Sequence, residues 1–130
     1  MRKEIRAEKM NPPIGHYTDA VQFGNLLFLA GCGPTNSDLE VVGGDDAGAQ
    51  ARQVFENMRT VLEAAGASLQ DVLKVTVYLT DINDRSKVEP VRAEYFGSAR
   101  PASATIGVAE LAVPEAKVEI QAIAGIPTDQ

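Results

Sequence analysis

The sequence predicts an α+β fold, in which a mixed β-sheet of five or six strands carries two helices on one face. Two observations lead to this class. Segments with an apolar residue at every second position alternate along the chain with two segments of helical period. Their order, ββαβαββ, gives a mixed sheet rather than a purely parallel one. Because 130 residues is the size of a single core, residues 1–130 are interpreted as one domain.

A β-hairpin is predicted near the start of the chain. Residues 17–23 and 26–31 are rich in β-forming residues, and Gly24 and Asn25 between them have the composition of a tight two-residue turn. A further short strand is expected at residues 4–7.

The next segment predicts an amphipathic helix. Asp45 or Asp46 suits its N-terminus, and Gly66 suits the position just past its C-terminus. Apolar residues recur on one face at spacings of three and four. These residues are Ala51, Val54, Phe55, Met58, Val61, Leu62 and Ala65.

The middle of the chain predicts a half-buried strand followed by a second helix. Residues 71–81 alternate between apolar and polar side chains. The apolar side of the alternation consists of Leu73, Val75, Val77 and Leu79. The helix is expected from about Val88 to Phe96, with Pro90 tolerable only near its first turn and Gly97 as its stop.

Two final strands are expected at residues 102–110 and 116–124. In the second, Val118, Ile120 and Ala122 alternate with Lys117, Glu119 and Gln121. Two helices cover only one face of such a sheet, and small or semi-polar Ala, Thr, Tyr and Ser side chains are expected on the other. Another copy of the chain is the simplest cover, so we predict a closed homo-oligomer with clefts between its subunits.

Charge and composition disfavour several classes of partner. Eighteen acidic and twelve basic residues give a net charge of -6, which repels a nucleic-acid backbone. No apolar run approaches the ~20 residues of a membrane span, and the charged leader does not resemble a signal peptide, so a cytoplasmic location is expected. A single Cys and a single His cannot supply a usual zinc ligand set, so no metal is expected.

Four stretches together resemble the Rid family, also called YjgF, whose founding activity is that of RidA. They are "IGHYTDAVQFGNLLFLAG", "AGAQARQVFENMRTVLEAAG", "DVLKVTVYLTDIND" and "KVEIQAIAG", and they span almost the whole chain in the family's order. The resemblance implies a chorismate-mutase-like fold and a homotrimer with three clefts at its subunit interfaces. It also implies hydrolysis, without a cofactor, of reactive enamines and imines such as 2-aminoacrylate and 2-iminopropanoate, which releases ammonia and a 2-keto acid.

The resemblance assigns site roles to three residues. Tyr17, in "GHY", matches the tyrosine of the family's site, and Gly31 matches the glycine whose backbone N–H faces the substrate. Glu119, in "KVEIQAIA", matches the glutamate that is taken to position the attacking water.

Four positions depart from the family pattern. RidA-type members have "PARSC" where this chain has "PASAT", so Ser103 replaces the arginine that pairs with the substrate's α-carboxylate and Thr105 replaces a cysteine. Ala30 replaces a serine, and Glu89 replaces an asparagine. One serine hydroxyl cannot replace the two charge-assisted bonds of a guanidinium. The sequence therefore predicts a substrate other than 2-iminopropanoate, one that lacks the α-carboxylate.

Three further residues have two interpretations each, and a fourth, Arg100, has one. Arg85, where many RidA-type members carry a cleft-lining aromatic, either returns a positive charge from another wall or is a solvated loop residue. Arg100 is expected to point away from the site. Cys32 is either a reactive thiol or a small buried residue, and His16 either titrates in the cleft or is structural or exposed. A Cys32–His16 nucleophile pair lacks a third, orienting group.

Three functions follow from these residues. The first is a Rid-family deaminase or related hydrolase of a small enamine or imine, with Glu119 positioning the water. The alternative is a non-catalytic trimer that binds a small metabolite or has a regulatory role. Ribonuclease activity, which is reported for some members, is disfavoured by the acidic chain and the single histidine.

Overall fold

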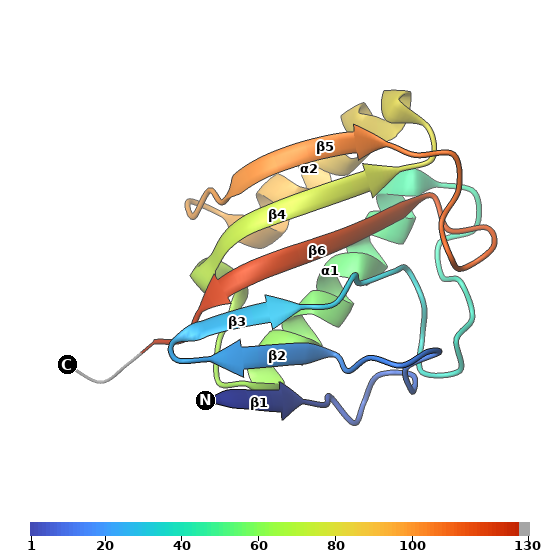
Figure 1. The fold of residues 1–130 in the computed structure, drawn as a ribbon. Helices are drawn as coiled ribbons and strands as arrows, with labels where there is room; N and C mark the ends of the chain where they lie inside the picture. Colours follow the sequence, from blue (N-terminus) through green and yellow to red (C-terminus); the bar gives the residue numbers. More distant parts are fainter. Residues whose placement is uncertain (128–130) are drawn as a thin grey trace.

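The structure, a computed structural model, describes residues 1–127. Six strands form one sheet, and both α-helices lie on the same face of it (Figure 1). In chain order the elements are β1 (Arg2–Ile5), β2 (Ala20–Phe23), β3 (Leu26–Leu29), α1 (Ala47–Ala64), β4 (Val72–Leu79), α2 (Arg85–Phe96), β5 (Ala102–Gly107) and β6 (Val118–Gly125). Short 3-10 helices at Leu69–Asp71 and Ile82–Asp84 precede β4 and α2. The predicted α+β class is confirmed.

The sheet has the strand order β1-β2-β3-β6-β4-β5. Strands β4 and β5 are parallel and are connected through α2, whereas β6 runs antiparallel to both of its neighbours, β3 and β4. The last strand of the chain therefore lies in the middle of the sheet and joins its two halves.

The hairpin is confirmed, although its strands are shorter than expected. Phe23 pairs with Leu26 across the turn, and Gly24 has a φ of 61°, which favours glycine. The first strand of the hairpin begins at Ala20 rather than at position 17, because the backbone turns back at Tyr17, whose N–H donates to the Gly15 carbonyl.

The other strand boundaries also shift. The strand expected at residues 4–7 is β1, at Arg2–Ile5. Strand β3 stops at Leu29 rather than at position 31, and pairing resumes as an isolated bridge between Cys32 and Ile120. Strand β5 ends at Gly107 instead of position 110.

Helix α1 has the predicted caps and the predicted buried face. The Asp46 carboxylate accepts the N–H of Gly48 at 2.8 Å, and Gly66 has a φ of 80° just past the helix. Of the seven apolar residues expected on the core face, six are buried and Ala65 is partly buried.

Two details of the middle segment were predicted wrongly. Leu73 is 52% exposed, because a β-bulge between Val72 and Lys74 moves it out of the alternation and Val72 takes the buried position. Helix α2 begins at Arg85 rather than Val88, so Pro90 lies in its second turn, where the helix lacks the N–H that would bond to the preceding turn.

The sheet face away from the helices is open in the single chain. It carries the small and semi-polar residues expected there, such as Thr76, Tyr78 and Ala104. It is more apolar than expected near β3, where Leu26 and Phe28 are each more than two-fifths exposed.

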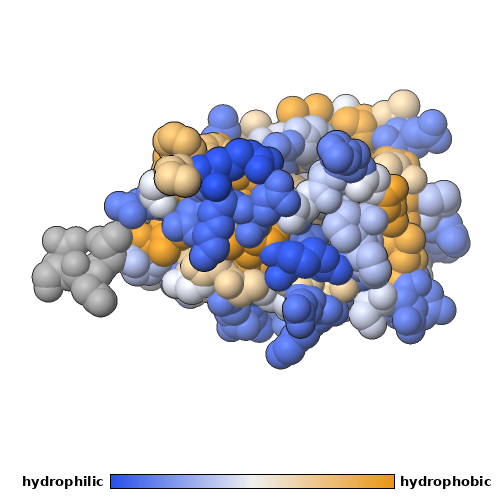
Figure 2. All heavy atoms as spheres, turned by 60° about the horizontal axis from the view of Figure 1, so that its bottom comes forward, coloured by the Kyte–Doolittle hydropathy of each residue, from blue (hydrophilic) through white to orange (hydrophobic). Residues whose placement is uncertain are grey.

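The free edge at β1 is polar. Arg2, Lys3 and Glu4 are all exposed, and such charges discourage the addition of a further strand. Figure 2, in which the bottom of Figure 1 comes forward, shows mainly hydrophilic residues on this side of the molecule. None of the helices within residues 1–127 is both long and apolar enough to cross a membrane.

Gln50 ties α1 to two loops. Its side chain is fully buried, and its amide nitrogen donates to the carbonyl oxygens of Gly44 at 2.7 Å and Glu115 at 3.0 Å. Its amide oxygen accepts the N–H of Lys117 at 2.7 Å. One side chain therefore fixes the loop before α1 and the start of the segment that leads into β6.

Replacing Gln50 with Ala is expected to lower the free energy of unfolding by about 2–4 kcal/mol, because three backbone groups lose their partner. The measurement is urea unfolding followed by circular dichroism. The matched control is Gln70→Ala, at an exposed site, which is expected to change the free energy by less than about 0.5 kcal/mol. Equal effects of the two substitutions would contradict this role of Gln50.

Candidate active site

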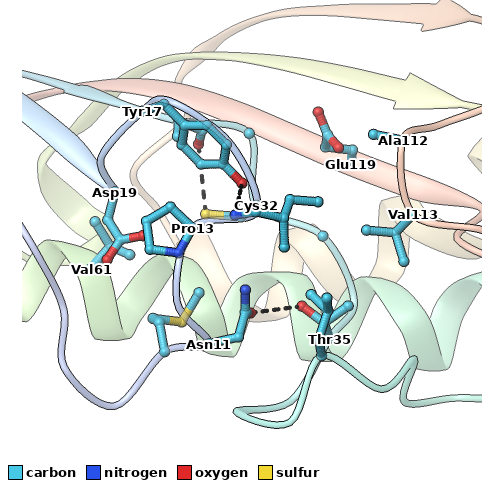
Figure 3. Close-up of a pocket in the computed structure, with 16 residues that line it drawn as sticks. Asn11, Pro13, Tyr17, Asp19, Cys32, Thr35, Val61, Ala112, Val113 and Glu119 are labelled. Atoms are coloured by element: carbon cyan, nitrogen blue, oxygen red, sulfur yellow. Dashed lines mark hydrogen bonds between the residues drawn. The ribbon is translucent and has the colours of Figure 1, made fainter.

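The first candidate cavity, which we call the Glu119 pocket, has a volume of about 320 Å³. Its walls come from the segment before β2, the turn after β3, the loop before β6 and β6 itself (Figure 3). The site residues predicted from the sequence that it brings together are Tyr17, Ala30, Gly31, Cys32 and Glu119. Ala112 and Val113, which sequence reasoning did not single out, add an apolar wall.

The absence of a side chain at Gly31 makes room for the Glu119 carboxylate. A Cβ built on Gly31 would lie 2.3 Å from Glu119 Oε2, far inside contact distance. Within residues 1–127, the Gly31 N–H has no hydrogen-bond partner. The pocket therefore places an exposed backbone donor beside a carboxylate.

Burial raises the pKa of Glu119 above its ordinary value. The residue is only partly accessible and has no ion-pair partner among residues 1–127. A carboxylate that holds its proton at a higher pH than usual is better suited to exchange protons with a substrate near neutral pH.

A second carboxylate in the pocket has a structural role. Asp19 is buried, forms an ion pair with Arg6 at 2.5 Å and accepts the Ala7 N–H at 2.9 Å. Sequence reasoning missed this residue, because its partners lie more than ten positions away along the chain. Asp19 holds the segment after β1 against the start of β2.

Cys32 is a buried residue whose thiol stays protonated. Burial, with smaller contributions from the charges of Asp19 and Glu119, raises the pKa of Cys32 to about 12. The thiolate is the reactive form, so this environment suppresses nucleophilic chemistry. His16 is exposed and does not line the pocket, so the Cys32–His16 nucleophile pair is not assembled.

Tyr17 lies at the rim of the Glu119 pocket. Its side chain is about half exposed, and its hydroxyl oxygen accepts the Ile14 N–H at 3.3 Å. This bond holds the ring over the cavity, as Figure 3 shows.

The other predicted site residues lie in a second cavity of about 360 Å³ between α2 and β5, which we call the Arg92 pocket. It brings together Arg85, Glu89, Ser103 and Thr105. Arg85 is the first residue of α2 and not part of the preceding loop. Arg100, which was expected to point elsewhere, also lines this cavity.

Sequence reasoning missed Arg92. Its guanidinium donates to Ser103 Oγ at 3.0 Å, and its side chain is only 12% exposed. The signal was helical spacing, since Arg85, Glu89 and Arg92 lie four and then three residues apart, on one face of α2. The prediction that the helix begins at about Val88 left Arg85 outside it, so the shared face of Arg85, Glu89 and Arg92 was not recognised.

The Glu119 side chain and the side chains of Ser103 and Thr105 lie on opposite faces of the sheet. Thr105 pairs with Val77, which faces the helices, whereas Glu119 pairs with Tyr78, whose side chain is on the open face. Ser103, opposite Val75, is also on the helix side and not on the open face where it was expected. A single chain therefore cannot bring Ser103 and Thr105 to the Glu119 carboxylate.

Neither pocket contains a group of metal ligands. No set of three or more His, Cys, Asp or Glu side chains arranged to hold a metal ion occurs within the described part of the chain.

Comparison with known proteins identifies the family. The sequence model of the family described as "Endoribonuclease L-PSP" matches residues 8–126. The chain belongs to the Rid family. The Rid fold that the sequence resemblance implied is therefore confirmed, and the Glu119 pocket is a feature of a Rid-family protein.

Three similar proteins show the range of the Rid family. A RutC family protein of Pyrococcus horikoshii is 47% identical, over 95% of this chain and 98% of that protein. A 2-iminobutanoate/2-iminopropanoate deaminase of Dermatophagoides farinae is 43% identical, over 93% of this chain and 94% of that protein. The crystal structure of E. coli TdcF with bound serine has a TM-score of 0.88 at 32% identity, covering 96% of this chain and 99% of that one.

The raised pKa of Glu119 predicts a pH-dependent effect on stability. The folded state binds the proton more tightly than the unfolded state, so the wild type loses stability as the pH rises from the ordinary glutamate pKa through the folded-state pKa. Glu119→Gln removes this loss and is expected to be the more stable protein at neutral pH. The two proteins are expected to converge at about pH 3, where the carboxyl is neutral in both states.

The measurement is urea unfolding of both proteins over a series of pH values. Glu63→Gln, the same change at an exposed position on α1, is the control for general charge effects. A difference between wild type and Glu119→Gln that does not grow with pH would contradict the assignment.

Proposed function

We propose that this protein is a deaminase that hydrolyses a small imine or enamine, with Glu119 positioning and activating the water. The observation that carries the proposal is the partly buried Glu119 carboxylate, which lies against Gly31, whose backbone N–H has no hydrogen-bond partner within residues 1–127. The similarity to a protein named as an imine deaminase supports the same reaction class.

The proposed reaction needs no group beyond water and one carboxylate. Water bound to Glu119 attacks the carbon of the C=N bond, and the carboxylate accepts its proton. The same carboxyl returns that proton to nitrogen, which gives a carbinolamine. It then transfers the hydroxyl proton of the carbinolamine to nitrogen, the C–N bond breaks, and ammonia leaves as the carbonyl forms. An enamine first takes a proton on carbon and loses one from nitrogen, which gives the imine. A carboxyl with a raised pKa suits both steps, because it is a good base and a good acid in the same pH range.

We further propose that the complete site forms between subunits of a homotrimer. Ser103 and Thr105 lie on the face opposite Glu119, so a cleft that contains both sets needs two chains. Packing of the open face around a three-fold axis also covers the exposed Phe28 and Leu26. In this arrangement the Glu119 pocket of one chain meets the Arg92 pocket of its neighbour.

The substrate is proposed to differ from 2-iminopropanoate. Ser103, Thr105 and Ala30 change the walls on which a RidA-type site holds that compound, and Glu89 adds a negative charge near the cleft. RNA is not a fitting substrate for the Glu119 pocket, since the Glu119 carboxylate repels phosphates.

Replacing Glu119 with Gln is expected to lower the deamination rate by about 10²–10⁴-fold, the usual size of general acid–base assistance. The measurement is keto-acid formation from enzymatically generated imines and enamines of different side chains, with Glu63→Gln as the matched control. Equal rates for Glu119→Gln and wild type would refute the mechanism. A ligand that binds in the cleft but is never turned over would favour the non-catalytic, metabolite-binding alternative.

Mixed assemblies test whether the site is shared between chains. Glu119→Gln removes the carboxylate from one wall of the proposed cleft, and Thr105→Trp puts a bulky side chain on the other wall. Random mixing of the two inactive proteins is expected to restore activity in about a quarter of the clefts, those with one intact wall from each chain. Sedimentation should give three times the chain mass of 13.8 kDa for the mixture.

The control replaces the second partner with the double variant Glu119→Gln/Thr105→Trp. No intact cleft can then form, and no activity is expected. A mixed trimer that also stays inactive with the single variants would contradict the shared site.

A further inference from the structure

We propose that Arg92 is the anion-binding residue of this protein and that it holds a carboxylate of the substrate from α2. The inference rests on the proposed function, and it changes the expected substrate from a compound without a carboxylate to a small carboxylate-bearing imine or enamine. The geometry that carries it is the contact between the Arg92 guanidinium and Ser103, the residue that replaces the arginine of RidA-type members.

The walls of the Arg92 pocket are basic, although the chain as a whole is acidic. Three arginines, Arg85, Arg92 and Arg100, line the cavity against a single carboxylate, that of Glu89. The whole chain carries a net charge of -6. A local excess of guanidinium groups around a cavity of about 360 Å³ favours an anionic ligand.

Arg92 has unused N–H donors, and its side chain is largely shielded from water. A guanidinium has five N–H donors. Within residues 1–127, the side chain of Arg92 makes one hydrogen bond, to Ser103 Oγ, and a loose ion pair with Glu89 Oε1 at 3.5 Å. Glu89 itself is 57% exposed, so it neutralises the buried guanidinium only weakly. A bound carboxylate would satisfy the remaining donors.

Ser103 reinforces this site. Its hydroxyl oxygen accepts the bond from Arg92, so the hydroxyl hydrogen is available for donation to an anion. One carboxylate can then accept from Arg92 and from Ser103 together. The serine at position 103 therefore positions an arginine from another element instead of merely removing a charge.

Helix α2 holds Arg92 in place. Arg92 lies two residues after Pro90 and four residues before Phe96, which packs in the core. The residue projects from a helix that packs against α1, and its direction is fixed by the Ser103 contact. The charge is therefore preorganised, which is the condition for selective recognition of a carboxylate.

The test compares binding of pyruvate with that of pyruvamide, a neutral compound of the same size, by ligand-observed NMR titration of the intact protein. The wild type is expected to bind pyruvate on the order of 10- to 100-fold more tightly, the usual value of a hydrogen bond to a charged group. Arg92→Gln is expected to remove this preference, and Arg92→Lys to keep only part of it, because a lysine lacks the fork of donors.

Lys87→Gln is the matched control. It removes one positive charge from the same helix at a side chain that does not line the pocket, so the preference for pyruvate should remain. Equal binding of pyruvate and pyruvamide by the wild type would overturn the inference without any variant. Retained preference in Arg92→Gln, or equal losses in Arg92→Gln and Lys87→Gln, would also overturn it.

The same titration with Glu119→Gln separates this inference from the proposed function. Binding of pyruvate needs no turnover, so the preference for pyruvate over pyruvamide is expected to survive that substitution. If the anion preference depends on Arg92 but Glu119→Gln leaves catalysis unchanged, the mechanism fails and the anion site stands. If catalysis depends on Glu119 but the preference for pyruvate does not depend on Arg92, the mechanism stands and the anion site is refuted.

Discussion

The position of β6 between β3 and β4 is the constraint on which both the sheet and the candidate site depend. Past the end of β3, Cys32 and Ile120 exchange two backbone hydrogen bonds, at 2.8 and 3.0 Å. This antiparallel bridge places Gly31 and Glu119 on the same face of the sheet, diagonally across the bridged pair, because each precedes a bridged residue. The Glu119 side chain then reaches across to Gly31, where a Cβ would collide with it. Gln50 supports the same strand by anchoring the loop that leads into it.

The two carboxylates of the Glu119 pocket have opposite environments. Asp19 is paired with Arg6 and with a backbone N–H, so its charge is satisfied within the fold. Glu119 is partly desolvated and has no cationic partner within residues 1–127; the desolvation raises its pKa and makes its ionised form costly. The first arrangement stabilises the structure. The second lowers stability at neutral pH, which is the trade-off expected if Glu119 has the proposed catalytic role.

The parts of the fold that were predicted correctly are those encoded by local patterns. The caps of α1, its buried face, the Gly24 turn and the alternation of β6 each follow from residues that are close in sequence. The exposure of Leu73 could not be predicted, because a bulge is decided by pairing with β6 and not by the alternation itself.

Only the part of the candidate site in the Glu119 pocket was predicted correctly from the sequence. Glu119, Gly31 and Tyr17 were identified through family motifs, and the structure places them in one pocket. The orientation of Ser103 was not predictable, because β5 has the sequence "ASATIG", in which neither side of the strand is clearly apolar. Arg92 was missed because it lies outside the motifs, and its role depends on contact with a strand that follows the helix.

The two edges of the sheet differ in a way that affects the fate of a free chain. The β1 edge is protected by charged residues, but the β5 edge carries only small, hydroxyl or aliphatic side chains along Ala102–Gly107. An unpaired strand of that composition is a template on which further chains can add. A chain outside the proposed homotrimer has this edge, Phe28 and Ile106 exposed to solvent. For such a chain, dissociation would be the first step of aggregation.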